Sequence, residues 1–274
     1  MNILDKIIEH KKKEVALRKE LYPVKLLERS IYYSSPCVSL KKYLLREDKV
    51  GIIAEIKRKS PSKGMINKYV DIERTSIGYM QAGASALSVL TDEEFFGGKS
   101  EDLSLARKYN YCPILRKDFT IDEYQIIEAK SIGADVILLL ANVLNAQQIK
   151  SFTTLAHDLG LEVLLELRDE EELDKYHSGI DVVGVNNRSL KNFEVSLEQS
   201  YKFAGLLPSS ALKVSESGIH QAKDLVDLKQ KGFNGFLIGE SFMKHSRPEQ
   251  ACAEFIKQVN DLMLSYSPLR HSAH

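Results

Sequence analysis

Short apolar runs alternate with helical patterns from about residue 50 almost to the end of the chain. The runs are rich in β-branched residues and continuously apolar, which is typical of strands buried on both faces. Each run is followed by a stretch whose apolar positions recur with the period of a helix. The pattern therefore predicts eight βα units. Their strands are Val50–Ile56, Ala86–Leu90, Pro113–Leu115, Asp135–Leu140, Glu162–Leu165, Ile180–Val185, Leu212–Val214 and Gly235–Ile238.

Eight successive βα units favour a closed barrel. Parallel strands joined by right-handed crossovers can close when there are eight of them. An open, doubly wound sheet usually has fewer strands and carries a nucleotide-binding fingerprint. We therefore predict an α/β fold, a (β/α)8 TIM barrel, over residues 50–265. Barrels of this kind run to roughly 250 residues as one domain, so the 274 residues of the chain require no second catalytic domain.

The segments on either side of the barrel have different patterns. Residues 1–49 are predicted to form a helical extension packed on the barrel. Apolar positions in residues 3–15 have helical spacing, Pro23 interrupts the pattern, and a second helical stretch surrounds Leu40. Residues 266–274 are predicted to form a frayed tail.

The composition excludes several classes of protein. Lysine plus arginine number 38, as do aspartate plus glutamate, so no net charge favours nucleic acid as a partner. The longest apolar stretch, Val136–Leu144, falls short of the ~18 residues of a membrane span, and charges interrupt residues 1–10, unlike a signal peptide. The scattered Cys37, Cys112 and Cys252 suit a reducing compartment. We expect a cytoplasmic protein without a membrane partner, and a monomer, with a dimer as the alternative.

Polar side chains stand where the apolar runs end. In a closed barrel the carboxyl ends of all strands share one face, so these side chains converge on a common mouth. Glu55 and Lys57 lie on the same side of their strand, because side chains repeat every two residues. Arg58, Lys59 and Arg116 are out of phase with the inward set, and we assign them to structural ion pairs. The other inward candidates are Lys117, Glu166, Asn186, Glu216 and Ser217.

The last two strand ends predict an anion site. Ser217–Gly218 and Gly239–Ser241 each precede a helical segment, whose exposed backbone N–H groups can bind phosphate. Phosphate sites in barrels commonly follow the seventh and eighth strands. The segment Gly97–Ser100 lacks the earlier glycine of a nucleotide P-loop, with Glu93 in that position, so ATP is not predicted. The histidines have no metal-ligand spacing, and no metal site is predicted.

Several of these segments together resemble the indole-3-glycerol phosphate synthase family. Ile52–Ser62, with the sequence IIAEIKRKSPS, is similar to the family's signature segment over its full length. The resemblance covers about residues 1–262 and includes the N-terminal extension. The further matching segments, in the family's order, are Phe95–Gly98, Ile114–Phe119, Val185–Arg188, Ser215–Ile219 and Phe236–Gly239.

The resemblance implies a reaction without cofactor or metal. The family cyclises an anthranilate-bearing deoxyribulose 5-phosphate with loss of CO2 and water, a carboxy-lyase step in tryptophan biosynthesis. It implies that Lys117 is the general acid that protonates the ribulose carbonyl and that Glu166 serves acid–base chemistry in the dehydration. Lys57 would engage anionic groups of the substrate and share the acid role. The rest of the polar shell would be Glu55, Asn186, Glu216 and Ser217.

The resemblance also implies how the phosphorylated substrate binds. The phosphate would lie on the backbone amides of Gly218, Gly239 and Glu240, with Lys57 and Ser60 closing the site. Glu240 departs from the small residue that we expect there, and its carboxylate would point away from the phosphate. The remaining expected substrate contacts are Phe96 and Phe119, which resemble a wall for the aromatic ring, and Arg188.

Three other interpretations remain open from the sequence. Phosphoribosylanthranilate isomerase would share the phosphate site, but its acid–base pair is a cysteine and an aspartate, whereas the first strand here ends in Glu55 and Lys57. A Schiff-base aldolase could use Lys117 or Lys57 as its nucleophile. A binding protein that kept the barrel but lost activity would show gaps among the polar strand ends, and we find none.

Overall fold

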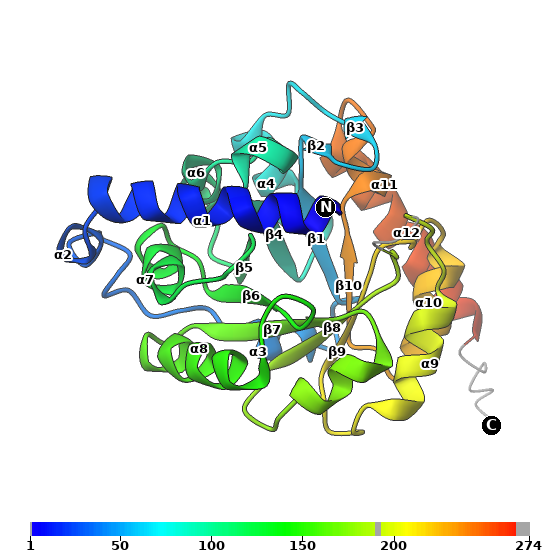
Figure 1. The fold of residues 1–274 in the computed structure, drawn as a ribbon. Coiled ribbons are helices and arrows are strands. Elements are labelled where there is room, and N and C mark those ends of the chain that lie inside the picture. Colours follow the sequence, from blue (N-terminus) through cyan, green and yellow to red (C-terminus); the bar gives the residue numbers. More distant parts are fainter. Residues whose placement is uncertain (1, 190–192, 267–274) are drawn as a thin grey trace, which may run out of the picture.

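The computed structural model describes residues 2–189 and 193–266. Eight parallel strands follow one another around a closed barrel, and the last pairs with the first (Figure 1). The predicted α/β barrel is therefore confirmed. The barrel strands are β1 (Ile52–Ile56), β4 (Ala86–Leu90), β5 (Ile114–Lys117), β6 (Val136–Leu140), β7 (Glu162–Leu167), β8 (Val182–Asn186), β9 (Lys213–Glu216) and β10 (Gly235–Ile238).

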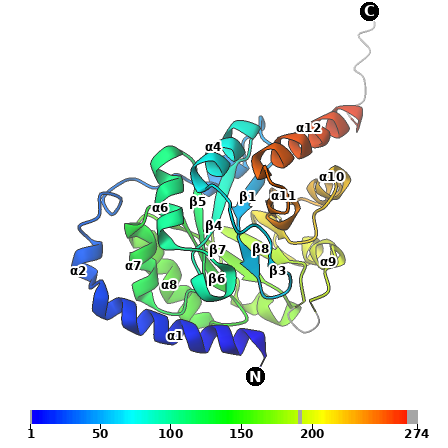
Figure 2. The ribbon, with the colours of Figure 1, turned by 90° about the horizontal axis from the view of Figure 1, so that it is seen from above.

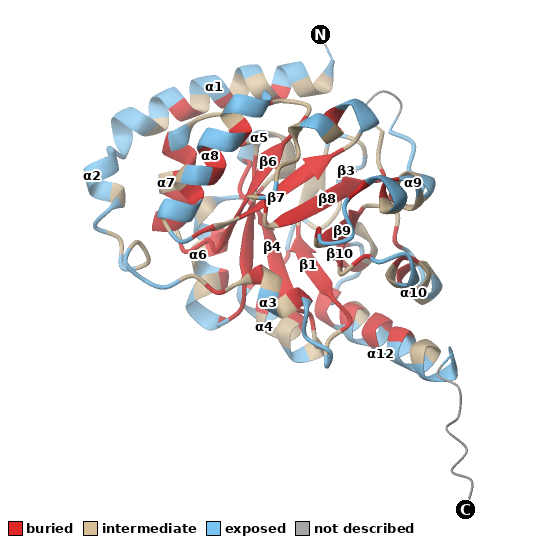
Figure 3. Cartoon of the chain, turned by 90° about the horizontal axis from the view of Figure 1, so that it is seen from below, coloured by how far each residue is buried: buried red, intermediate tan, exposed pale blue. Residues whose placement is uncertain are grey.

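The barrel strands are buried almost throughout their length (Figure 3). Helices cover their outer faces, so the continuous apolar character of the strands reflects burial on both sides. The covering α-helices are α4 (Ile72–Ala82), α6 (Ser100–Tyr109), α7 (Glu123–Ser131), α8 (Ala146–Asp158), α9 (Glu198–Leu206), α10 (Ala222–Gln230) and α12 (Pro248–Tyr266).

The connection after β7 differs from the predicted α-helix. It forms a 3-10 helix, η1 (Glu170–Lys175), whose first turn is closed by a capping box between Asp169 and Glu172. The segment is only six residues long, and short pieces of helix commonly adopt this tighter form. Helix α12 extends to Tyr266, and the rest of the predicted tail lies outside the described residues.

Three short elements lie near the carboxyl ends of the barrel strands. The hairpin of β2 (Lys59–Ser60) and β3 (Gly64–Met65) follows β1. Helix α5 (Glu93–Phe96) follows β4, and α11 (Glu240–Met243) follows β10. Asp92 caps α5 by accepting a hydrogen bond from the backbone N–H of Phe95.

The residues before β1 reach both ends of the barrel. Helix α1 (Ile3–Leu21) runs beside α7 (Figures 1 and 2). Pro23 then begins the short α2 (Val24–Leu27). Helix α3 (Leu40–Leu44) places Leu40 and Leu44 in the apolar cluster within the barrel, together with Ile53. Among the described residues, we find no helix with the length and apolar composition needed to cross a membrane.

Candidate active site

A pocket opens at the carboxyl ends of the barrel strands, and every site residue proposed from the sequence lines it. These residues come from segments far apart in the chain, and barrel closure brings them together. They are Glu55, Lys57, Ser60, Phe96, Lys117, Phe119, Glu166, Asn186, Arg188, Glu216, Ser217, Gly218, Gly239 and Glu240.

Lys117, the last residue of β5, contacts two carboxylates, one from β7 and one from β9. Its Nζ atom is 2.5 Å from Oε2 of Glu216 and 3.4 Å from Oε2 of Glu166. Burial favours the neutral amine, but Glu216 and Glu166 outweigh it and raise the pKa of Lys117. The side chain is therefore an ammonium at neutral pH, as a proton donor must be.

Glu166 and Glu216 differ in their protonation. Burial opposes ionisation of both carboxyl groups. For Glu166, Arg168 and Lys117 outweigh burial and lower the pKa to about 2. For Glu216, burial outweighs the attraction of Lys117, and the neighbouring Glu166 adds repulsion, which raises its pKa to about 7. At neutral pH Glu166 is therefore ionised, whereas Glu216 is the member of the pair that can take up a proton.

A second lysine–glutamate pair enters from β1. Lys57 Nζ lies 2.8 Å from Oε1 of Glu55, and Ser88 Oγ donates a hydrogen bond of 3.3 Å to Oε2. Burial opposes ionisation of Glu55, but Lys57 and Lys117 outweigh it and lower the pKa of this carboxyl. Both ammonium groups of the pocket are thus paired with carboxylates.

Two glycines leave room for these buried carboxylates. A Cβ atom built on Gly184 would lie 2.1 Å from Oε1 of Glu216, and one on Gly239 would lie 2.6 Å from Oε1 of Glu55. Such distances are far below van der Waals contact. The small residues in β8 and after β10 therefore allow two carboxylates to sit inside the barrel mouth.

We expect Gly184→Ala to lower both activity and stability, because the new methyl group would displace the Glu216 carboxylate from Lys117. Overpacking of this kind costs about 1 to 3 kcal/mol. Urea unfolding and kcat would measure the two effects. Gly205→Ala in α9 is the matched control, since its Cβ would meet no atom within 4 Å. Equal effects of the two substitutions would contradict this explanation.

The turn after β9 has a left-handed backbone. Ser217 has φ 70° and Gly218 has φ 81°, a region that costs a non-glycine residue about 1 kcal/mol or more. Hydrogen bonds hold the turn: Asn187 Nδ2 donates to the carbonyl of Ser217 at 3.0 Å, and Ser217 Oγ donates to Oδ1 of Asn186 at 3.1 Å. The strained turn lies beside Gly239 in the pocket wall.

The Glu240 carboxylate lies beside two cations at this side of the pocket. Its Oε2 atom is 3.4 Å from NH2 of Arg188, and its Oε1 atom is 3.4 Å from Nζ of Lys63. These contacts account for a carboxylate at a position where the sequence pattern suggested a small residue. Whether only its backbone N–H meets a phosphate stays a prediction.

The opposite side of the pocket is apolar. The rings of Phe96 and Phe119 lie 5.9 Å apart between centroids and are tilted by 38°. Ile3, Leu4 and Ile7 of α1 add further apolar lining to the pocket. Sequence reasoning missed the α1 residues, because helical spacing indicates an apolar face but not what it covers.

Arg168 was also missed, although the sequence carried a signal for it. Its NH2 atom lies 2.5 Å from Oε1 of Glu166. Glu166 and Arg168 are two residues apart, the same spacing as Glu55 and Lys57. Because β7 continues to Leu167, this spacing points both side chains toward the pocket.

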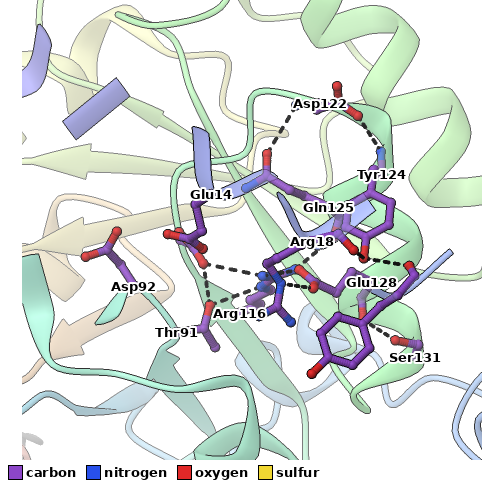
Figure 4. Close-up of polar contacts among 12 residues, drawn as sticks. Glu14, Arg18, Thr91, Asp92, Arg116, Asp122, Tyr124, Gln125, Glu128 and Ser131 are labelled. Atoms are coloured by element: carbon purple, nitrogen blue, oxygen red, sulfur yellow. Dashed lines mark hydrogen bonds and ion pairs between the residues drawn. The ribbon is translucent and has the colours of Figure 1, made fainter. Parts of the chain in front are cut away.

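Two of the out-of-phase cations form the structural ion pairs that we expected. Buried Arg116 contacts Oε2 of Glu128 at 2.6 Å and donates to Oγ1 of Thr91 at 3.0 Å (Figure 4). Arg58 pairs with Asp102. Lys59 instead donates to the backbone carbonyl of Glu94 at 2.6 Å, so the expected ion pair is wrong for this residue.

The geometry weakens two alternatives. Cys37, Cys112 and Cys252 are absent from the described pocket lining, whereas the isomerase needs a cysteine there. A Schiff-base aldolase needs a neutral amine nucleophile, whereas two carboxylates keep Lys117 protonated.

Comparison with solved structures supports the fold. A Pyrococcus furiosus chain from a structure of the tryptophan synthase a2b2 complex has a TM-score of 0.56 and 15% identity, covering 78% of this chain and 99% of that chain. Thiamine phosphate pyrophosphorylase from the same organism has a TM-score of 0.57 and 16% identity, covering 79% and 98%. At this identity the likeness concerns the barrel alone.

Sequence comparison identifies the family. Residues 4–255 match the family described as indole-3-glycerol phosphate synthase. A protein of that name from Bacteroides thetaiotaomicron is 46% identical over 94% of this chain and 99% of its own length. Another from Caldanaerobacter subterraneus is 41% identical over 94% and 98%. The chain belongs to the indole-3-glycerol phosphate synthase family.

Proposed function

We propose that this pocket closes the indole ring of 1-(2-carboxyphenylamino)-1-deoxyribulose 5-phosphate, with loss of CO2 and water, as a step of tryptophan biosynthesis. The observation that carries the proposal is the placement of an ammonium, Lys117, against ionised Glu166 at 3.4 Å, inside a pocket with one apolar and one polar side. Membership of the family supports the same reaction.

Ring closure needs a proton donor. The aromatic carbon that bears the carboxyl group attacks the ribulose carbonyl carbon, and negative charge develops on the carbonyl oxygen. In our proposal Lys117 protonates this oxygen as the general acid, and Lys57 shares that role. An ammonium can do so even with a raised pKa, because the developing alkoxide is more basic than an amine. Loss of CO2 then restores the electron pair to the ring system.

Dehydration needs an acid and a base. In our proposal Lys57, which shares the acid role, protonates the departing hydroxyl, and ionised Glu166 removes a proton from the ring system, so that the former carbonyl oxygen leaves as water. After the dehydration, the proton on Glu166 returns to the Lys117 amine through their contact. A proton from solvent, matching the one consumed in the loss of CO2, restores Lys57. We assign the supporting polar shell to Glu55, Asn186, Glu216 and Ser217.

The two sides of the pocket suit the two ends of the substrate. We assign the aromatic ring to the apolar side with Phe96 and Phe119, and Arg188 to the substrate contacts. The phosphate would lie on the backbone amides of Gly218, Gly239 and Glu240. In the same assignment, Ser60 and Lys57 close the phosphate site from the side of β1.

The test is to incubate the protein with the carboxyphenylamino-deoxyribulose phosphate and to follow indole fluorescence. The chain contains no tryptophan, so the product signal is easily seen. We expect turnover without added metal and a strong loss in Glu166→Gln. No fluorescence with folded protein would overturn the proposal, and borohydride trapping of a substrate imine would favour the aldolase.

We further propose that the enzyme works as a cytoplasmic monomer. Cys37, Cys112 and Cys252 are free thiols, which suits a reducing compartment. The proposed acid, base and anion site all come from a single chain. Sedimentation at the concentration of the activity assay would test the monomer.

A further inference from the structure

The two carboxylates beside Lys117 are held differently. Lys117 Nζ contacts Oε2 of both Glu166 and Glu216. The other oxygen of Glu166, Oε1, forms an ion pair of 2.5 Å with NH2 of Arg168. Neither Oε1 atom has a hydrogen-bond partner within residues 2–189 and 193–266. The difference lies in the ion pair, because Oε1 of Glu216 is buried beside Gly184 and contacts no cation among these residues. Glu166 thus has a cation at each oxygen.

Arg168 is fixed by the protein around it. Its NH1 atom donates to the carbonyl of Arg188 at 2.8 Å, and its backbone N–H donates to Oε2 of Glu172 at 2.7 Å. Its carbonyl accepts a hydrogen bond from Nε2 of Gln199. The side chain is only 17% exposed. These contacts hold the guanidinium against Glu166 rather than leaving it free for a ligand.

Burial opposes ionisation of Glu166, Arg168 and then Lys117 favour it most, and the Asn186 side chain adds a smaller hydrogen-bond contribution. Lys117 is shared by both carboxylates. Strand β6, which also pairs with β7, lines the pocket with apolar Leu138 and Leu140. Arg168 is therefore the cation that touches one carboxylate and not the other among the described pocket residues. Glu55 also acts on the pair, since it repels Glu216, and it is itself paired with Lys57.

We propose that Arg168 is a positioning residue for the ring closure: through its ion pair with Oε1, it keeps Glu166 ionised as the base and leaves the proton of the carboxylate pair on Glu216. The inference rests on the proposed function, which gives the Glu166 carboxylate its task. Two adjacent carboxylates do not both ionise readily, and a base acts only when it is deprotonated. Arg168 therefore determines which of the two carboxylates, Glu166 or Glu216, is ionised and able to accept a proton.

The test compares the pH dependence of kcat/KM in the wild type and in Arg168→Gln. We expect the wild type to keep its activity from pH 8 down to about pH 6, because Glu166 stays ionised. Without Arg168, Glu166 takes up a proton at higher pH, and its ionised fraction falls tenfold per pH unit below its pKa. The variant should therefore lose about tenfold more activity than the wild type between pH 8 and pH 6. Arg168→Lys, which keeps the charge, should recover most of the loss.

A double substitution tests whether Arg168 acts through Glu166. In a Glu166→Gln background, Arg168→Gln should change kcat/KM by less than about twofold, because coupled residues are not additive. A parallel pH profile for Arg168→Gln and the wild type would overturn the proposal. The proposal would also be overturned if the loss of kcat/KM in the double variant equalled the product of the fold-losses in the two single variants.

A readout without catalysis separates this inference from the proposed function. The carboxyl carbon of Glu166, labelled with carbon-13, can be titrated by NMR in the unliganded protein. We expect its titration to move to higher pH in Arg168→Gln and to return in Arg168→Lys. An unchanged titration would overturn the role of Arg168 even in an active enzyme. A shifted titration in a protein that makes no indole would leave this role intact and reject the proposed function.

Discussion

Replacing Lys117 by methionine is expected to reduce kcat by about 10² to 10⁴, the usual contribution of a positioned proton donor. The substitution removes the ammonium that lies between Glu166 and Glu216 and so leaves no group in that position to neutralise the developing alkoxide. Glu216, whose pKa is already raised, can take up a proton in response, and we expect the fold to persist. Indole fluorescence and circular dichroism would measure the two properties.

Lys117→Arg separates charge from proton donation. Arginine keeps the positive charge but does not release a proton at accessible pH, so we expect its kcat to stay far below that of the wild type. Lys229→Met in α10 is the control, because Lys229 is half-buried but lies outside the pocket. Turnover near the wild-type value in Lys117→Met would refute the assignment of the acid.

The second large effect is expected from Lys11→Met in α1. Lys11 is fully buried, and its Nζ atom lies 2.9 Å from Asp92 and 3.0 Å from Asp118, just after β4 and β5. Removing one partner of a buried ion pair costs about 3 to 5 kcal/mol, because the remaining charge is uncompensated. Urea unfolding at pH 7 should show this loss. Lys13→Met removes an exposed pair with Glu9 from the same helix and should cost no more than about 1 kcal/mol.

The pH dependence gives the Lys11 prediction a second check. Burial opposes ionisation of Asp118, but Lys11 and Arg116 outweigh it and lower its pKa to about 2. A carboxyl group whose pKa is lower in the folded than in the unfolded protein stabilises the fold at pH values above its pKa in the unfolded protein. This stabilisation is lost as the pH falls toward its pKa in the folded protein. The stability difference between wild type and Lys11→Met should therefore shrink as pH falls from about 5 to 3. A constant difference would show that lost packing, not charge, causes the effect.

The sequence predicted the barrel well because its strands are buried on both faces. Ala86–Leu90 and Gly235–Ile238 coincide with β4 and β10. The predicted run Pro113–Leu115 stopped early, since β5 continues through Arg116 and Lys117, and Lys117 is paired in register with Leu90. The charged residues Arg116 and Lys117 end the apolar pattern but not the strand. Their backbones still pair with β4, and Lys117 also belongs to the site.

The part of the site that follows from the barrel topology could be predicted from the sequence. Parallel strands in a barrel must bring their carboxyl ends together, and this rule placed Lys117 and Glu166 in one pocket. The docking of α1 was not predictable in the same way. It depends on buried Lys11 meeting Asp92 and Asp118, a contact between distant segments that no local spacing indicates.

Closure of the barrel by β10 has a consequence for how the protein is made. Strand β1 pairs with β10 through Ile53 and Leu237, so one edge of β1 stays without a partner while the intervening chain leaves the ribosome. Contacts between such distant positions form slowly, and an open strand edge invites association with other nascent chains. Only after β10 arrives can Leu40 and Leu44 be enclosed by a complete ring. The period in which the newly made chain most needs a chaperone therefore ends when the last βα unit has been synthesised and β10 has paired with β1.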